Sequence, residues 1–362
     1  MNRFFYYLII VNMITNVLTF IPRILLNERL TGGLLAIPIG TIVGMGLMYF
    51  FIKQISKFPG MGLPEILEKY LPKWFKNIYI FFNGFMWFYA GIFTLLSLIT
   101  ITKVFISPDM SGFLITGMFL LLLCFYILMP SKKVLYATEL IIILNTPFIL
   151  LILIKAIFNE YFSWDAVRIF LTHYRELPSW SAISAATFIY FGFANLIIFN
   201  REFQKINLKW LWLIILFGLQ VLLVTTFGPI GFHGAVRGVE AYVFPWVSTA
   251  DSMRMELGFV ERVLFIFLLL HLNISLVSIL IHWHVSLQLF KSIFPKFKVK
   301  GKNIISYVIS AFFAIMTFII DALTSENNHF DIMKTWINGL IPAALFMNIV
   351  LLWTIRRKKK YE

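Results

Sequence analysis

The first apolar segment of the chain carries four polar side chains that could bind a small molecule. They stand at i, i+3, i+4 and i+7, so a helix places them on one face: Asn12, Thr15, Asn16 and Thr19. Amides and hydroxyls in hydrocarbon are costly unless they meet other protein groups or a water-filled cavity. The stripe therefore predicts either a ligand site or a set of hydrogen bonds between helices, and both remain open.

A second polar cluster follows in the sixth apolar segment. It contains Ser184, Thr187, Tyr190 and Gly192, and it ends at Asn195, which lies 179 residues after Asn16. A glycine beside small and polar residues can let a transmembrane helix open and leave backbone groups free for a ligand. Close packing of Gly192 against a neighbouring helix is the alternative. The repetition of Asn16 by Asn195 favours the ligand site.

A third cluster lies in the eighth segment, where His271, Ser275 and Ser278 share a helix face. His271 could carry a proton, although a neutral histidine satisfied by a neighbour is the preferred interpretation. His282 and His284 are two residues apart and point to different sides of a helix, so they do not form a metal site by themselves. Neither a phosphate-binding glycine loop nor a nucleophile elbow is present. We expect no enzyme activity, metal or cofactor.

Composition identifies the elements that must hold these clusters. Hydrophobic residues make up 60% of the 362 residues and charged residues 13%, whereas soluble domains have about 25% charged residues. A helix crosses a bilayer with about 20 apolar residues. The sequence therefore predicts an all-α polytopic membrane protein with ten transmembrane helices, over residues 4–26, 31–55, 78–102, 112–130, 134–157, 180–200, 208–230, 257–286, 304–322 and 334–355.

The basic residues predict the orientation of these helices. With ten crossings, 21 of the 31 Lys and Arg residues fall on the side that holds both termini. Because excess Lys and Arg stay in the cytoplasm, both termini are expected there. The net charge of +14 is thus explained by topology, and the basic tail 356–362 by contact with lipid headgroups rather than nucleic acid. The single cysteine, Cys124, cannot form an internal disulfide.

The chain also shows signs of an internal repeat. An offset of 179 residues places the first three apolar segments on the sixth, seventh and eighth. A repeat of five helices enters the membrane in opposite senses, which gives the inverted-topology symmetry of many secondary transporters. We expect one membrane domain, 1–362, with a first repeat at 1–157 and a second at 180–355.

Two connections are expected to form surface helices. Residues 64–78 have an apolar face and a charged face, so this segment should lie flat on the cytoplasmic surface. The connection 228–256 should form an extracytoplasmic loop with a short helix near Ser248 and Asp251.

Several short motifs resemble those of a known family. They are Gly238-Val239-Glu240, Phe244-Pro245 and Glu261-Arg262, together with the early Pro22 and with Phe58-Pro59-Gly60. In order and spacing they resemble the endospore germination permease family, the integral-membrane B subunit of nutrient germinant receptors. That family is part of the amino acid, polyamine and organocation transporter superfamily. The resemblance covers essentially the whole chain.

The resemblance implies an inverted five-plus-five bundle whose first and sixth helices are interrupted around a small-molecule site. It places the breaks around Thr15 to Thr19 and Tyr190 to Asn195. Glycines normally open the first helix of amino acid permeases, whereas this chain has Thr15, Asn16 and Val17 there. Side-chain amides and hydroxyls are therefore expected to replace backbone contacts. Glu261 and Arg262 are expected to pair with loop groups and fix the loop.

The resemblance also implies a function. The protein would act with the A-type and C-type subunits of a germinant receptor in the spore inner membrane, with an amino acid, sugar or nucleoside as ligand. We expect that nutrient between the first, third, sixth and eighth helices. The alternative is a secondary amino acid transporter, proton-coupled through His271. A scaffold for a complex and a membrane enzyme are the weaker hypotheses.

Overall fold

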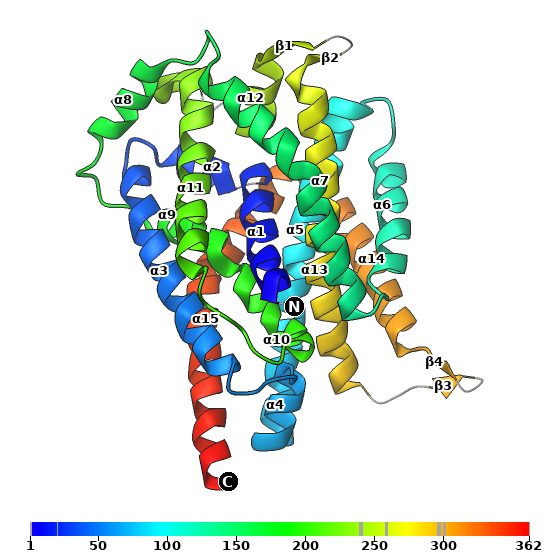
Figure 1. Ribbon diagram of the computed structural model, residues 1–362. Coiled ribbons are helices and arrows are strands. Elements are labelled where there is room, and N and C mark those ends of the chain that lie inside the picture. The colour runs from blue at the N-terminus through cyan, green and yellow to red at the C-terminus, as the bar shows by residue number, and fades with distance from the viewer. Residues whose placement is uncertain are drawn as a thin grey trace.

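The computed structural model describes residues 2–19, 21–238, 242–257, 260–294, 298–299 and 302–361, and it shows a helical bundle with two short β-hairpins (Figure 1). Helices α8 and α12 and hairpin β1–β2 lie at one end, here called the α12 end, while α4 and the C-terminus lie at the other, the α4 end. The helices are α1 (Asn2–Leu18), α2 (Ile21–Asn27), α3 (Gly33–Ile55), α4 (Leu63–Tyr70), α5 (Lys73–Ile101), η1 (Thr102–Ile106), α6 (Gly112–Tyr126), α7 (Ser131–Ile157), α8 (Trp164–Thr172), α9 (Trp180–Phe188), η2 (Ile189–Asn195), α10 (Leu196–Phe199), η3 (Asn200–Glu202), α11 (Leu211–His233), η4 (Gly234–Gly238), α12 (Pro245–Ser252), α13 (Val263–Ile293), α14 (Ile305–Leu323) and α15 (Glu326–Tyr361). The strands are β1 (Arg254–Leu257), β2 (Val260–Arg262), β3 (Lys298–Val299) and β4 (Lys302–Asn303), paired antiparallel as β1–β2 and β3–β4.

Eight helical segments of the described chain are long and apolar enough to cross a membrane, and α1 with α2 makes a ninth if this bent pair counts as one span. The predicted fourth span, 112–130, forms the apolar helix α6 of only 15 residues, which is shorter than the usual 20. The multi-pass helical membrane architecture is therefore confirmed. Ten crossings remain a prediction.

The first spanning segment is interrupted. Helix α1 ends at Leu18, and α2 continues from Ile21 at an angle of 56°. Pro22 explains the position, because its ring crowds the carbonyl of the residue four before it, Leu18, and it has no N–H to bond that carbonyl. In the first turn of α2 the same proline is well tolerated. The bend lies between Leu18 and Ile21, so the part of the predicted break from Thr15 to Leu18 is helical instead.

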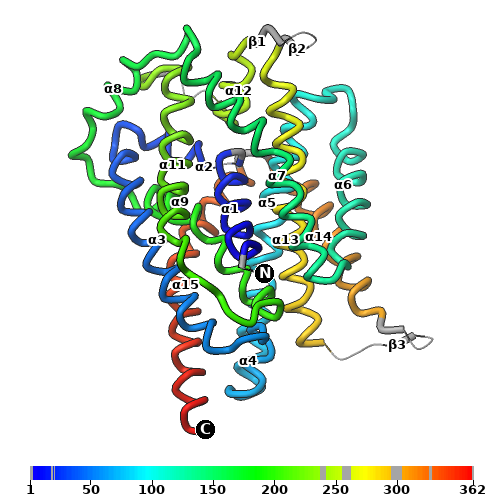
Figure 2. Tube along the Cα trace, viewed as in Figure 1, coloured from blue at the N-terminus to red at the C-terminus, as the bar shows by residue number. Residues whose placement is uncertain are grey.

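The sixth spanning segment changes its winding in the predicted place. After α9, residues Ile189–Asn195 form the 3₁₀ helix η2, and α10 follows with a single α-helical turn. A 3₁₀ helix in the middle of a span is more tightly wound and often marks a functional hinge. Figure 2 shows α1 running inside the bundle, between α3 and α11 on one side and α7 and α13 on the other. Helix α1 packs directly against η2.

The amphipathic surface helix is shorter than expected. Helix α4 ends at Tyr70, and Leu71 is extended, with φ −122° and ψ 160°. Residues before a proline disfavour the α conformation, so Pro72 separates α4 from the long α5 that begins at Lys73. The second half of the predicted segment 64–78 therefore belongs to the third span.

The connection at the α12 end contains the expected short helix. Helix α12 begins at Pro245, which has no N–H to leave unpaired at a helix start. Arg262 of β2 lies 3.9 Å from the carboxylate of Asp251 in α12, measured from Nη1 to Oδ1. Glu240 and the side chain of Glu261 lie outside the described residues.

Candidate functional site

Two neighbouring cavities lie in the middle of the bundle, between α1, α5, the sixth spanning segment, α13 and α15. We call them the polar cavities because amide and hydroxyl side chains interrupt their mainly apolar walls. The inner cavity, nearer the α4 end, has a volume of about 50 Å³, and the outer cavity, nearer α2, has about 20 Å³. The walls of both include Asn12, Ala90, Phe188, His282 and Trp336. Four of these five helical elements are the ones that the sequence predicted around a ligand.

Asn12 joins the first spanning segment to the sixth. Its side-chain Nδ2 donates to the carbonyl oxygens of Phe188, at 2.9 Å, and Ile189, at 3.0 Å. In a regular α-helix these carbonyls would accept from N–H groups four residues later. The change to 3₁₀ winding begins at this point, so the amide of Asn12 satisfies backbone groups that the altered helix leaves available.

The rest of the first polar stripe lines the outer cavity, which includes Thr15, Asn16 and Thr19 in its wall. Thr15 donates to the Val11 carbonyl at 2.7 Å, and Asn16 donates through Nδ2 to the Asn12 carbonyl at 2.7 Å. These bonds stay within α1. They leave the oxygen of the Asn16 amide without a described intramolecular donor.

Asn195 is the last residue of η2 and lies in the wall of the inner cavity, which Asn12 of α1 also lines. Its Oδ1 accepts from the indole Nε1 of Trp87 in α5 at 2.7 Å, and its Nδ2 donates to the carbonyl of Gly192 at 3.2 Å. Trp87 also lines this cavity. The two predicted asparagine positions therefore meet at one site, Asn195 in its inner part and Asn16 in its outer part.

Three other residues predicted in the sixth segment point elsewhere. Thr187 donates to the carbonyl of Gly40 in α3 at 3.3 Å, and the Tyr190 hydroxyl donates to Thr41 at 3.2 Å. A Cβ on Gly192 would lie 2.5 Å from the carbonyl oxygen of Leu8 in α1. These residues hold the sixth segment against its neighbours, and none of them lines either cavity.

The eighth span contributes a different histidine from the predicted one. His271 and Ser275 are buried and share a 3.4 Å contact, but neither lines the polar cavities. Ser278 lines the outer cavity, and His282 lines both. His282 Nδ1 lies 2.7 Å from the Ser278 carbonyl. Because the two residues are one turn apart, the helical spacing from Ser278 could have located His282.

Helix α15 supplies a wall that the sequence did not reveal. Trp336 of α15 packs edge-on against Phe93 and Phe188, with ring centroids 5.6 and 5.4 Å apart. Its indole Nε1 is buried and has no hydrogen-bond partner in the described structure. Leu340 and Ala344 continue the same wall at spacings of four residues. These side chains are mostly apolar, so they carried no polar signal in the sequence.

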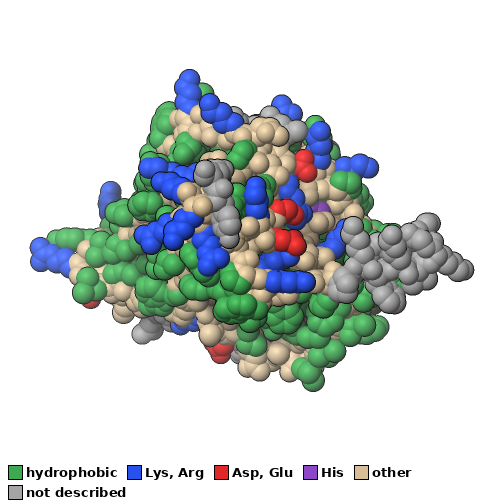
Figure 3. Space-filling model, turned by 90° about the horizontal axis from the view of Figure 1, so that it is seen from below, with side chains coloured by type: hydrophobic (Ala, Val, Ile, Leu, Met, Phe, Trp, Pro, Cys, Tyr) green, Lys and Arg blue, Asp and Glu red, His purple; other side chains and the backbone are tan. Residues whose placement is uncertain are grey.

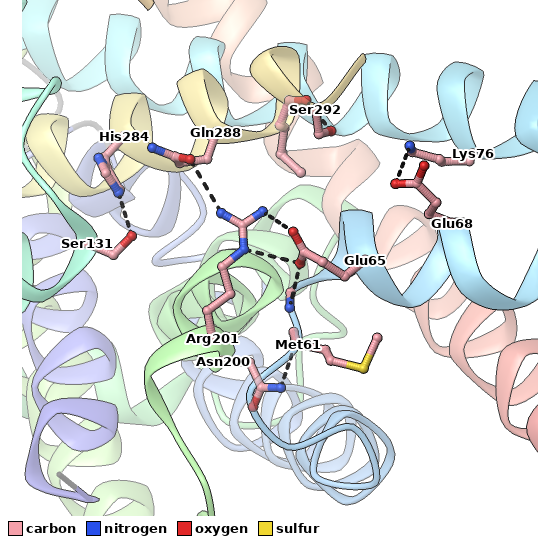
Figure 4. Close-up of polar contacts among 12 residues, drawn as sticks. Met61, Glu65, Glu68, Lys76, Ser131, Asn200, Arg201, His284, Gln288 and Ser292 are labelled. Carbon is pink, nitrogen blue, oxygen red and sulfur yellow. Dashed lines mark hydrogen bonds and ion pairs between the residues drawn. The ribbon is translucent and has the colours of Figure 1, made fainter. Parts of the chain in front are cut away.

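A polar network lies at the α4 end of the bundle (Figure 4). Arg201 of η3 binds Glu65 of α4, with Nη2 to Oε1 at 2.7 Å and Nε to Oε2 at 3.1 Å. Its Nη1 also donates to Gln288 of α13 at 3.4 Å. The neighbouring Asn200 donates to the carbonyls of Phe58 and Met61. The end of the sixth segment is thereby tied to the surface helix and to the eighth span.

The face at the α4 end is strongly basic, as Figure 3 shows in a view from that side. The segments that end there carry exposed Lys53, Lys57 and Lys69. Helix α15 continues to Tyr361, so the predicted tail 356–362 begins as part of the last helix. Glu139 of α7 pairs with Arg3 of α1, with Nε to Oε1 at 2.7 Å.

Comparison with known protein families gives a match over most of the chain. The sequence profile of a family described as spore germination protein matches residues 2–328. Among curated proteins, the chain has no significant match.

Proposed function

The chain belongs to the spore germination protein family, and from this membership and its polar cavities we propose that it is the nutrient-sensing membrane subunit of a germinant receptor. The observation that carries the proposal is the meeting of Asn12 and Asn195 at one cavity, each from an interrupted spanning segment. Amides can both donate and accept hydrogen bonds, so they suit a small polar nutrient such as an amino acid, sugar or nucleoside.

The size of the site favours a conformational response. A cavity of about 50 Å³ has room for one or two waters, each of which takes about 30 Å³ in the liquid. A nutrient must therefore separate the walls when it enters. A ligand that binds one arrangement more tightly than the other shifts the population toward it, and partner subunits can detect that shift.

The proposal also includes the membrane topology of the chain and its partners. Ten crossings, with inverted repeats at 1–157 and 180–355 in one domain, would place both termini and the basic face in the cytoplasm. The breaks in the first and sixth segments support such symmetry. The basic face suits anionic lipid headgroups of the spore inner membrane. The A-type and C-type receptor subunits are the proposed protein partners.

The sensing proposal is tested in spores that carry Asn195→Leu, which preserves the approximate size and removes hydrogen bonding. We expect germination to require a higher nutrient concentration. Asn273→Leu is the matched control, because Asn273 is also a spanning asparagine, in α13, but lines neither polar cavity. An unchanged nutrient response in the Asn195 variant, at equal protein abundance, would remove the site from consideration. Copurification of two further subunits with the intact chain tests the partners.

Transport is the second candidate function, because His282 lies in the wall of both cavities and could exchange a proton with a ligand. The intact chain reconstituted alone in liposomes separates the two functions. Sensing without transport predicts nutrient binding and no accumulation inside the vesicles. Uptake that is driven by an imposed pH gradient, and that loses this dependence in His282→Gln, would establish proton-linked transport instead.

A further inference from the structure

Arg23 is a cation at the α2 end of the outer cavity. It lies in α2, two residues after Ile21, which lines that cavity. Its guanidinium carbon is 4.1 Å from the ring centroid of Phe330 in α15. Phe330 precedes the cavity residue Met333 by almost one helical turn. Arg23 lines neither cavity itself, but it joins α2 to α15, the two helices that supply Ile21 and Met333 to the wall of the outer cavity.

No protein acceptor compensates this guanidinium in the described chain. Nη1 of Arg23 is buried and has no hydrogen-bond partner there. Other arginines at this end are engaged: Arg29 donates to the Leu26 and Val236 carbonyls, and Arg168 pairs with Asp165 at 3.0 Å. The carboxylate of Glu28, in the connection just after α2, accepts hydrogen bonds from Ser179 instead. A buried donor nitrogen without a protein acceptor is costly, so the buried Nη1 of this guanidinium suits an anionic ligand.

A second unpaired donor supports the same conclusion. Trp336 lines both cavities, and its buried Nε1 also has no partner among the described residues. The Arg23 and Trp336 nitrogens are both donors, one charged and one neutral. They are complementary to a ligand that presents oxygen acceptors and a negative charge.

We propose that Arg23 binds the carboxylate of the nutrient at the α2 end of the polar cavities. This inference rests on the proposed nutrient-binding function and narrows it to carboxylate-bearing ligands, amino acids above all. An anionic oxygen group could also come from the phosphate of a lipid. The buried position of Nη1 favours the nutrient, because a headgroup at the lipid surface would meet an exposed guanidinium.

The test uses the purified full-length chain in nanodiscs of phosphatidylcholine. Binding is measured by thermal stabilisation and by calorimetry for L-alanine, L-valine and L-phenylalanine, each compared with its C-terminal amide, and for glucose and adenosine. The amides keep the side chain and the ammonium group and lose the anion. We expect at least one acid to bind more tightly than its amide. Arg23→Met should weaken that acid by roughly 10- to 100-fold and leave the amide nearly unchanged.

Two further variants separate binding from folding. Arg23→Lys keeps the charge and should retain part of the preference for the acid, while Arg168→Gln removes an exposed arginine at the same end and should change nothing. A ligand role also predicts that Arg23→Met leaves the melting temperature without ligand unchanged or higher, because an uncompensated cation is removed. A structural role predicts a lower melting temperature instead and would overturn the proposal.

The remaining outcomes distinguish the proposals from each other. If acids and amides bind equally, or if Arg23→Met preserves the ratio of their affinities, the carboxylate assignment is wrong and nutrient sensing stands. If no nutrient in a complete amino acid, sugar and nucleoside panel binds, both proposals fail. Nanodiscs with added phosphatidylglycerol form the last arm. An Arg23-dependent stabilisation that follows this lipid and no soluble acid would assign the anion to a headgroup phosphate.

Discussion

Trp87 donates its indole N–H to the side-chain oxygen of Asn195 across 2.7 Å, and this bond joins the third spanning segment to the sixth at the wall of the inner cavity. It fixes the orientation of the Asn195 amide. Trp87 takes one of the two acceptor positions of the oxygen, and the Gly192 carbonyl takes one of the two N–H groups, so one acceptor position and one N–H remain for a ligand.

Replacement of Trp87 by Phe removes this donor and keeps an aromatic ring. A neutral hydrogen bond contributes about 1 kcal/mol, so nutrient affinity should fall by roughly fivefold as the amide loses its fixed orientation. Calorimetry on the purified chain measures the change. Trp180→Phe is the control, because Trp180 also donates from its indole, to the Asn338 carbonyl, but lines neither cavity. Equal losses in both variants would contradict an orienting role for Trp87.

The leucine variants of the two asparagines in α1 should differ in stability. Asn12→Leu leaves the carbonyls of Phe188 and Ile189 without their side-chain donor, and an unsatisfied buried polar group costs about 1–3 kcal/mol. Asn16→Leu removes only a bond within α1, and side-chain bonds inside membranes average about 0.6 kcal/mol.

Thermal unfolding of both variants in detergent measures this order. Asn12→Leu should have the lower melting temperature, while Asn16→Leu should stay near the wild type and lose mainly nutrient affinity. The reverse order would mean that Asn12 does not hold the 3₁₀ segment against α1.

Gly192→Ala should separate α1 from η2. The added Cβ would lie 2.5 Å from the Leu8 carbonyl oxygen and 2.6 Å from the Cα of Ile9, and backbone atoms cannot move aside as a flexible side chain can. Overpacking of this kind costs about 1–3 kcal/mol, so the melting temperature and nutrient affinity should both fall. Gly46→Ala in α3 is the matched control, because no atom lies within 4 Å of its added Cβ. Comparable losses in the two variants would rule out the close approach.

The sequence predicted the change of winding in the sixth segment, but it placed the first break at Thr15 to Thr19, where the chain is helical as far as Leu18. The causes of both features are local. Pro22 disrupts the helix hydrogen-bond ladder wherever it stands, and an amide in an apolar segment requires a partner wherever the helix packs. The offset of 179 residues then related Asn16 to Asn195, and the structure places both at the cavities.

Which way a side chain faces depends on tertiary packing, which the sequence alone does not show. Thr187 and Tyr190 are polar members of the sixth segment, but they bond to α3. His271 was preferred to His282, although only the latter lines the cavities. The sequence offered no reason to choose Trp336 among ten tryptophans. Its place in the cavity wall depends on the packing of α15 against α9, the first helix of the sixth spanning segment. Arg23 was passed over because its missing partner is visible only in three dimensions.

The Arg201–Glu65 pair should control access to the inner cavity from the α4 end. It ties η3, which follows the cavity residue Asn195 by five residues, to the surface helix α4. The pair is partly exposed, with 25% and 45% of the two side chains accessible, so it contributes about 0.2–1 kcal/mol. Breaking it with Arg201→Gln should raise the open population by up to roughly fivefold.

This opening can be followed by the labelling rate of a cysteine introduced as Ala344→Cys in the inner cavity wall, in a Cys124→Ser background that removes the native thiol. A membrane-impermeant maleimide applied at the α4 end should react faster in Arg201→Gln and in Glu65→Gln. The charge exchange Arg201→Glu with Glu65→Arg should return the rate toward that of the parent, because the pair re-forms with opposite polarity. Arg168→Gln breaks an exposed ion pair at the opposite end and should leave the rate unchanged. Faster labelling in the exchanged pair, equal to that of the single variants, would show that the end of η3 is held by Asn200 and its two carbonyl bonds rather than by this pair.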